Sequence, residues 1–228
     1  MIANLPLGAW VALIVTVCLA VVDWGAVRAE IRGLEIFAKP ATLLGLIAMT
    51  LVLALTPGAT VSQTETWIFV AALVFCLGGD VLLMVLRENI IPGLVSFLLG
   101  HVLYVVGINT LALSPWVSAV AAVVVVAGIA FVVCATVFDW FRGIKERPAL
   151  VAYMVVIGLM VASAWTLPWR EGVPLGSAIA GMVGASLFFF SDSMIAYSRF
   201  MKPFENSHFW IMVTYHLGQI GLVLSLVA

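Results

Sequence analysis

Two aspartates lie inside apolar stretches of this chain, and their carboxyl groups are the side chains best suited to chemistry. Asp80 lies in F-C-L-G-G-D-V-L-L-M, and Asp192 lies in L-F-F-F-S-D-S-M-I-A-Y. A carboxylate at membrane depth is costly, so such residues usually face a protein interior or a wet cavity and usually serve a function. The pair therefore predicts acid and base chemistry inside a membrane protein.

The elements that must position these aspartates are transmembrane helices. Of the 228 residues, 64% are hydrophobic and only 9% are charged, which is too apolar for a soluble domain of this size. The composition predicts one integral membrane domain over residues 1–228. The net charge of −1 provides no basic face, so no nucleic-acid partner is expected. The first apolar run lacks a basic n-region and is expected to be a retained span rather than a cleaved signal peptide.

Eight apolar runs are each long enough to cross a bilayer as a helix of about 17–25 residues. They are Leu5–Val22, Pro40–Thr56, Trp67–Leu86, Ile91–Leu111, Trp116–Phe138, Ala149–Leu167, Leu175–Ser198 and Phe209–Ala228. Nine of the ten basic residues follow odd-numbered runs, and only Arg170 follows an even-numbered one. By the positive-inside rule, this asymmetry predicts an all-α polytopic bundle of eight spans with both termini on the non-cytoplasmic side.

The polar side chains within these runs share one predicted depth. Asp80 lies ~9 Å before the cytoplasmic end of its run, and Asp192 lies ~10 Å before Arg199, at 1.5 Å per helical residue. Polar residues of the fourth and eighth runs fall in the same slab, and they are His101, Tyr104, Tyr215, His216 and Gln219. Because lipid contact is unfavourable for such groups, we expect them to converge on one cavity in the cytoplasmic half.

Five segments of the chain resemble the lysoplasmalogenase (YhhN-like) family of membrane proteins. They are Lys39-Pro40, G-D-V-L-L-M at 79–84, S-F-L-L-G-H-V-L-Y at 96–104, L-F-F-F-S-D-S at 187–193 and T-Y-H-L-G-Q at 214–219. No single motif is specific, but five in this order, spread over essentially the whole chain, are fairly specific. His216 stands where the family more often has another aromatic or apolar residue, so no catalytic role is assigned to it.

The resemblance implies a hydrolase that cleaves the vinyl ether bond of a lysoplasmalogen to a fatty aldehyde and a glycerophospho-headgroup. The expected partners are this lysophospholipid and membrane lipids, with no cofactor and no metal. The expected location is a bacterial cytoplasmic membrane. Vinyl ethers are cleaved through protonation of the β-carbon and capture of an oxocarbenium-like state by water, so a protonated carboxyl and a carboxylate can divide the work.

The surroundings of the two aspartates suggest which one is the acid and which one is the base. Asp192 follows three phenylalanines, and because apolar surroundings favour the uncharged carboxyl, it is predicted to be the acid. Asp80 follows two glycines that leave room for water, and it is predicted to be the base. Ser191 is expected to orient Asp192, and Lys39 to hold the phosphate at the cytoplasmic mouth. The residues expected to orient the water or the ether oxygen are His101, Tyr104, Tyr215 and Gln219.

Two other functions compete with this hypothesis. One is a metal-dependent membrane lipid hydrolase, whose ligands would be Asp80, His101, Asp192 and His216. The chain has only three histidines and no H-x-x-x-H pair, which disfavours it. The other is a proton-coupled transporter or lipid carrier, because intramembrane acids also serve as proton relays. Polar groups confined to one half of the bilayer favour a one-sided enzyme over a path across the membrane.

Overall fold

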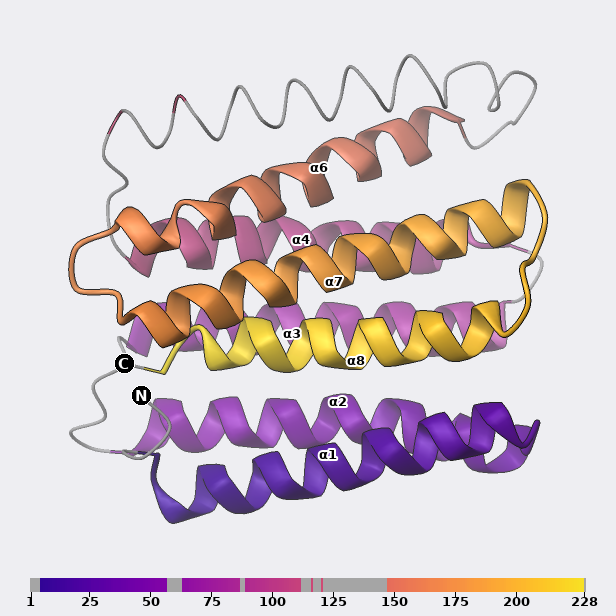
Figure 1. Cartoon of the computed structure of the whole chain (residues 1–228), viewed down its shortest axis with the longest axis horizontal. Coiled ribbons are helices and arrows are strands. Elements are labelled where there is room, and N and C mark those ends of the chain that lie inside the picture. Colours follow the sequence, from indigo (N-terminus) through magenta and orange to yellow (C-terminus); the bar gives the residue numbers. More distant parts are fainter. Residues whose placement is uncertain are drawn as a thin grey trace.

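The chain folds into a bundle of α-helices (Figure 1), as its composition predicts. The computed structural model describes residues 5–56, 63–86, 89–111, 116, 120 and 147–227. Its helices are α1 Leu7–Arg28, α2 Arg32–Leu55, α3 Gln63–Val85, α4 Ile91–Leu111, α6 Arg147–Trp165, α7 Leu175–Phe200 and α8 Ser207–Leu224, with a short 3-10 helix at Leu167–Trp169. No strand occurs among the described residues, and the all-α prediction is confirmed for them.

Six of the described helices, α1, α2, α3, α4, α6 and α7, are long and apolar enough to cross a membrane. The protein is therefore an integral membrane protein. α8, with 18 residues that include Tyr215, His216 and Gln219, is not among the six. The predicted fifth run, Trp116–Phe138, lies outside the described residues except at Trp116 and Val120. The count of eight spans and the side on which the termini lie stay predictions.

The described helices pack around a ring in chain order. α1 packs on α2, α2 on α3, α3 on α4, α4 on α6, α6 on α7 and α7 on α8. α8 closes the ring by contacting α1 and α2, and Figure 1 shows that α1 begins and α8 ends at the same end of the bundle. Side chains from helices far apart in the sequence can therefore meet at the centre.

The start of α8 contacts the end of α1 and the start of α2 through polar side chains. The Arg28 guanidinium donates a hydrogen bond of 2.5 Å to the side-chain oxygen of Asn206, the residue before α8. His208 Nε2 lies 2.7 Å from a carboxylate oxygen of Glu35 near the start of α2. These two contacts set the position of α8 against the first helix pair.

The two largest differences between the helices and the predicted runs both place charged residues inside the bundle. α1 continues to Arg28, beyond the predicted end at Val22, and Asp23 is fully buried in it. α2 begins at Arg32 and continues through Pro40. Lys39 therefore lies inside this helix, with 7% of its surface exposed, rather than at an open mouth as predicted. The predicted run began too late because proline is typical of a first helical turn.

Glycines allow two pairs of helices to approach closely. Between α7 and α8, a Cβ on Gly184 would lie 2.6 Å from the backbone nitrogen of Leu222, and a Cβ on Gly218 would lie 2.8 Å from that of Phe188. No side chain fits between these backbones. Between α3 and α4, a Cβ on Gly79 would overlap the ring of Phe97. The absence of a side chain at Gly79 therefore leaves the space that the buried Phe97 ring occupies.

Candidate active site

Asp80 on α3 is enclosed by partners from two other helices. Its Oδ1 lies 2.8 Å from Lys39 Nζ on α2, and its Oδ2 accepts a hydrogen bond of 2.7 Å from the Tyr215 hydroxyl on α8. Lys39 Nζ also lies 5.7 Å from the centre of the Tyr215 ring, within the range of a cation–π contact. Asp80 is 1% exposed. Both of its oxygens are therefore occupied, and the Lys39 ammonium balances its charge.

Asp192 on α7 meets a hydroxyl and an imidazole. The Tyr153 hydroxyl on α6 donates a hydrogen bond to Asp192 Oδ2, and His101 Nε2 on α4 lies 3.8 Å from the same oxygen. His101 Nδ1 lies 2.7 Å from the carbonyl oxygen of Phe97, so Nδ1 carries a proton and donates it there. In a neutral ring Nε2 then has only a lone pair to offer. At 3.8 Å this nitrogen and Asp192 Oδ2 are beyond hydrogen-bond distance, and His101 Nε2 has no hydrogen-bond partner among the described residues.

A cavity of about 100 Å³ lies beside Asp192, between α3, α4, α6 and α7. Its lining residues are Leu83, Ile90, Leu94, Phe97, Leu150, Tyr153, Met154, Asp192, Ile195, Ala196, Arg199 and Phe200. Nearly all of these are apolar, and only Asp192 and Arg199 carry charge. Asp192 is 9% exposed, whereas Asp80 is not part of the lining. An apolar ligand in this cavity therefore meets Asp192 first.

An aromatic layer lies between the two aspartates. The centre of the Phe188 ring is 4.7 Å from that of His101 and 5.2 Å from that of Tyr215. The Phe97 ring lies 6.1 Å from Tyr215 and 6.4 Å from Phe188. A chain of contacts thus leads from one aspartate through His101, Phe188 and Tyr215 to the other. Polar groups from six helices, α2, α3, α4, α6, α7 and α8, come together around an aromatic core.

Three predicted substrate-binding residues make contacts away from the cavity. The Tyr104 hydroxyl on α4 donates a hydrogen bond of 2.6 Å to Gln219 Oε1 on α8, and both side chains are fully buried. Gln219 Nε2 has no hydrogen-bond partner within the described part of the chain. The Ser191 hydroxyl donates a hydrogen bond of 3.0 Å to the Ile211 carbonyl oxygen. Ser191 thus joins α7 to α8 and does not bond to the neighbouring Asp192.

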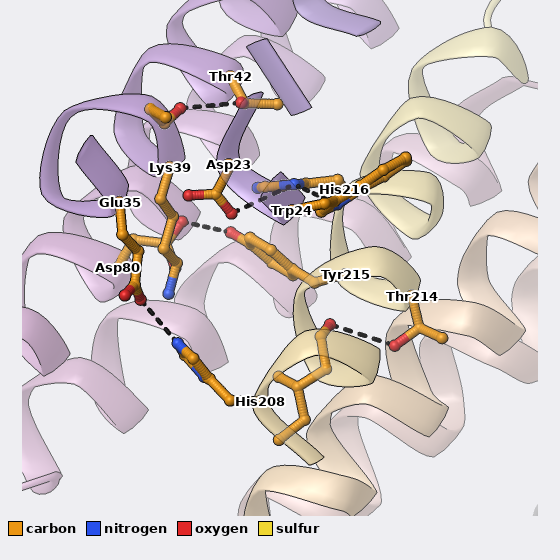
Figure 2. Close-up of polar contacts among 12 residues, drawn as sticks. Asp23, Trp24, Glu35, Lys39, Thr42, Asp80, His208, Thr214, Tyr215 and His216 are labelled. Carbon is orange, nitrogen blue, oxygen red and sulfur yellow. Dashed lines mark hydrogen bonds and ion pairs between the residues drawn. The ribbon is translucent and has the colours of Figure 1, made fainter. Parts of the chain in front are cut away.

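A third buried carboxylate lies on α1. Asp23 Oδ2 lies 3.9 Å from His216 Nδ1, and that nitrogen accepts a hydrogen bond of 3.2 Å from Trp24 Nε1. Figure 2 shows Asp23 and Trp24 facing His216, with Tyr215 beside them. Both carboxyl oxygens of Asp23 lack a hydrogen-bond partner among the described residues. The same is true of His216 Nε2. His216 therefore belongs to the contact between α1 and α8.

Sequence reasoning missed both Asp23 and Tyr153. Asp23 directly follows the predicted end of the first run, and a longer helix would have revealed it as a third intramembrane acid. Tyr153 lies six residues into α6. That depth matches the depth predicted for the other polar residues, so the signal was present for Tyr153 as well.

The four residues considered as metal ligands do not come together around one point. No three His, Cys, Asp or Glu side chains in the described ranges lie close enough to hold a metal ion. His101 faces Asp192 and His216 faces Asp23, while Asp80 faces an ammonium group. The metal-dependent alternative therefore has no ligand set in this part of the chain.

Comparison with known proteins identifies the family of this chain. The model of the YhhN family matches residues 34–226, which include both aspartates of the site and their partners but not Asp23 or Trp24. The chain is 28% identical to the lysoplasmalogenase TMEM86B of Homo sapiens over 162 residues, which are 70% of this chain and 63% of the human protein. The chain thus spans less than two thirds of that relative's length. No solved structure matches it. By its family match, the chain belongs to the YhhN family.

Proposed function

We propose that this protein is a membrane hydrolase that cleaves the vinyl ether bond of lysoplasmalogens to a fatty aldehyde and a glycerophospho-headgroup. Membership of the YhhN family and similarity to a protein named lysoplasmalogenase support the reaction. The observation that carries the proposal is the position of Asp192, which lines an apolar cavity with Tyr153 hydrogen-bonded to it and His101 facing it.

The apolar lining of the cavity suits the first carbons of the hydrocarbon chain of such a lipid, next to the vinyl ether. Leu83, Leu94 and Leu150 form its walls on α3, α4 and α6, and burial of hydrocarbon against such walls is favourable by about 25 cal/mol per Å². The reactive bond of a lysoplasmalogen lies at the first two carbons of this chain. Asp192 is the carboxyl that meets the chain in the cavity, so we place the vinyl ether against it.

In the first step Asp192 acts as the acid. Its carboxyl proton is transferred to the β-carbon of the vinyl ether, and the electron pair of the double bond forms the new C–H bond. The α-carbon becomes an oxocarbenium ion, which the Asp192 carboxylate stabilises electrostatically. The hydrogen bond from the Tyr153 hydroxyl keeps Asp192 oriented as the proton leaves, and His101 lies 3.8 Å from the same oxygen.

In the second step water adds to the α-carbon and gives up a proton. Asp80 is the base of this proposal, and the proton reaches it through the Tyr215 hydroxyl, which donates to Asp80 Oδ2. The resulting hemiacetal breaks its bond to the glycerol oxygen, which takes a proton as the aldehyde forms. Asp80 then loses a proton and Asp192 regains one. The balance is one water consumed, with one aldehyde and one alcohol formed.

Lys39 receives a different role from the one its position in the sequence suggested. Because its ammonium lies 2.8 Å from Asp80, we propose that Lys39 holds the base in place and does not bind the phosphate. Tyr104, Gln219 and Ser191 are proposed to support the site by joining α4 and α7 to α8.

Aldehyde release from a 1-alkenyl lysophospholipid by purified protein in detergent tests this function. We expect wild-type protein to form aldehyde and Asp192→Asn to lose at least about 100-fold in turnover, since removal of a general acid typically costs 10²–10⁴-fold. Ser193→Ala is the matched control, because among the described residues the Ser193 hydroxyl bonds within its own helix, to the Phe189 carbonyl. The thermal stability of each variant is measured beside its turnover, so that a loss of activity can be separated from a loss of folded protein.

Two outcomes would change the proposal. No aldehyde from folded wild-type protein would refute the reaction. Full turnover by folded Asp80→Asn would assign both proton transfers to Asp192 and remove Asp80 from the mechanism. A parallel reaction with EDTA checks for a metal requirement, and we expect no effect.

A further inference from the structure

Arg199 and Asp192 line the same cavity and come from the same helix, α7. They are seven residues apart, which is about two turns and roughly 10 Å along the axis, so both side chains leave the same face. Ile195 and Ala196, which lie between them on that face, also line the cavity. We propose that Arg199 is the phosphate-binding residue of this site and that its spacing from Asp192 selects the bond that is cleaved. This inference rests on the proposed function.

The charge of the lining supports a phosphate at this position. Among the described residues of the lining Arg199 is the cationic one, it lies in the last turn of α7, and it is exposed to the surroundings. A guanidinium forms paired hydrogen bonds with phosphate oxygens and stays charged at any physiological pH. A phosphate bound there keeps its contact with water while the apolar part of the same molecule enters the cavity.

The length of a lysophospholipid matches the spacing of the two residues. Seven covalent bonds separate the phosphorus from the β-carbon of a vinyl ether on the first glycerol carbon. With bonds of about 1.5 Å and angles of about 111°, this path spans roughly 9 Å when extended. The distance along α7 is roughly 10 Å. A phosphate held by Arg199 therefore brings the β-carbon to the carboxyl of Asp192.

This arrangement predicts selectivity for a phosphate-bearing lipid. An alkenylglycerol without phosphate has the same reactive bond and the same chain, but it gains nothing from Arg199. If Arg199 served only as a positive charge at the end of a helix, its substitution would lower kcat/KM equally for both substrates. The comparison of two substrates therefore separates a binding role from a structural one.

The test measures kcat/KM for a 1-alkenyl glycerophosphocholine and for the corresponding 1-alkenylglycerol. The variants are Arg199→Gln, Arg199→Lys and Lys202→Gln. We expect Arg199→Gln to lower kcat/KM by about 10- to 100-fold for the phospholipid only, mainly through KM, as loss of a charge-assisted hydrogen bond predicts. Arg199→Lys should recover part of the loss. Lys202→Gln is the control, because Lys202 is exposed at the same end and does not line the cavity.

Equal losses on both substrates, or no loss on either, would overturn the assignment. A binding measurement keeps this test separate from the proposed reaction. Wild-type protein and Arg199→Gln are titrated with an uncleavable 1-O-alkyl glycerophosphocholine, with binding followed by thermal stabilisation. Weaker binding by the variant supports the phosphate site even when wild-type protein cleaves neither substrate, which would refute the hydrolase alone. Equal binding by both proteins overturns the phosphate site.

Discussion

Asp80 and Asp192 are the same residue type in one helical bundle, but their surroundings differ in kind. Asp80 is closed in by an ammonium and a hydroxyl, and it lies outside the lining of the cavity. Asp192 meets a hydroxyl and an imidazole, and it lines the cavity. The carboxylate with the satisfied charge is thus the one kept from the ligand, and the carboxyl with neutral neighbours is the one presented to it.

We infer that the Asp80 cluster, besides holding the proposed base, contributes more to stability, and that the Asp192 cluster contributes chiefly to chemistry. Breaking a buried ion pair leaves an uncompensated charge, which is costly to the fold. Removing a donor from Asp192 leaves no buried charge of this kind, but it alters the group that meets the substrate. The variants below test this division, and each reports both the free energy of unfolding in detergent and the rate of aldehyde release.

Lys39→Met should have the largest effect on stability. It removes the ammonium and leaves the Asp80 carboxylate buried without its cation, which is expected to cost about 3–5 kcal/mol. Adding Asp80→Asn to it should restore most of the loss, because the unpaired charge is then gone. Lys202→Met, at an exposed lysine, is the matched control. A Lys39→Met protein as stable as wild type would contradict the ion pair as a source of stability.

Tyr153→Phe should show the opposite pattern. It removes the donor to Asp192, and we expect turnover to fall about 10- to 100-fold, with a stability change of only about 1 kcal/mol. Tyr197→Phe is a suitable control, because Tyr197 is exposed on the same helix as Asp192. Unchanged turnover with reduced stability would place Tyr153 with the structural cluster.

Asp23→Asn should sharpen the comparison by adding the third carboxylate. Asp23 is fully buried, and neither oxygen has a hydrogen-bond partner among the described residues. Removing its charge should raise the free energy of unfolding by about 1–2 kcal/mol and leave turnover unchanged, because a buried charge without a partner costs more than a neutral amide in the same place. A loss of turnover as large as that of Asp192→Asn would mean that Asp23 takes part in the reaction.

Ser191→Ala should have the smallest effect. Its hydroxyl bonds to the Ile211 carbonyl on α8, so the substitution should lower stability by roughly 0.5–1 kcal/mol with no change in turnover. Ser193→Ala, whose hydroxyl bonds within α7, provides the comparison. A specific loss of turnover in Ser191→Ala would return Ser191 to the role predicted from the sequence, in which it orients Asp192.

The sequence predicted the class of fold and the polar residues of the core, but not their pairing. An acid such as Asp80 in an apolar run is conspicuous, because few charged residues are tolerated there. The bond from Tyr215 to Asp80 joins residues 135 positions apart, and no local pattern encodes it. The helical period places a residue on a face, but it does not say which neighbouring helix that face meets.

The two residues that sequence reasoning missed have separate physical causes. Asp23 was left out because a charge was taken as the end of the first run, whereas the helix continues to Arg28. Tyr153 was not singled out because tyrosines are common near the ends of membrane spans for reasons unrelated to catalysis. Lys39 was placed at a mouth because Pro40 resembles a helix start. For Asp23 and Lys39 the observed helix extends past the local boundary signal, whereas the depth of Tyr153 already agreed with that of the other polar residues.

The contact between the backbones of α7 and α8 bears on how this site can be engineered. At Gly184 and Gly218 the two helices touch main chain to main chain, so no side chain there can be trimmed to make room. The distance between α7 and α8 is therefore fixed by main-chain contact. The cavity itself is bounded by side chains of α3, α4, α6 and α7, and Leu94, Met154 and Ile195 among them can be shortened to admit a bulkier ligand. The volume of the cavity is thus adjustable through its side chains, whereas the helix pair beside it is not.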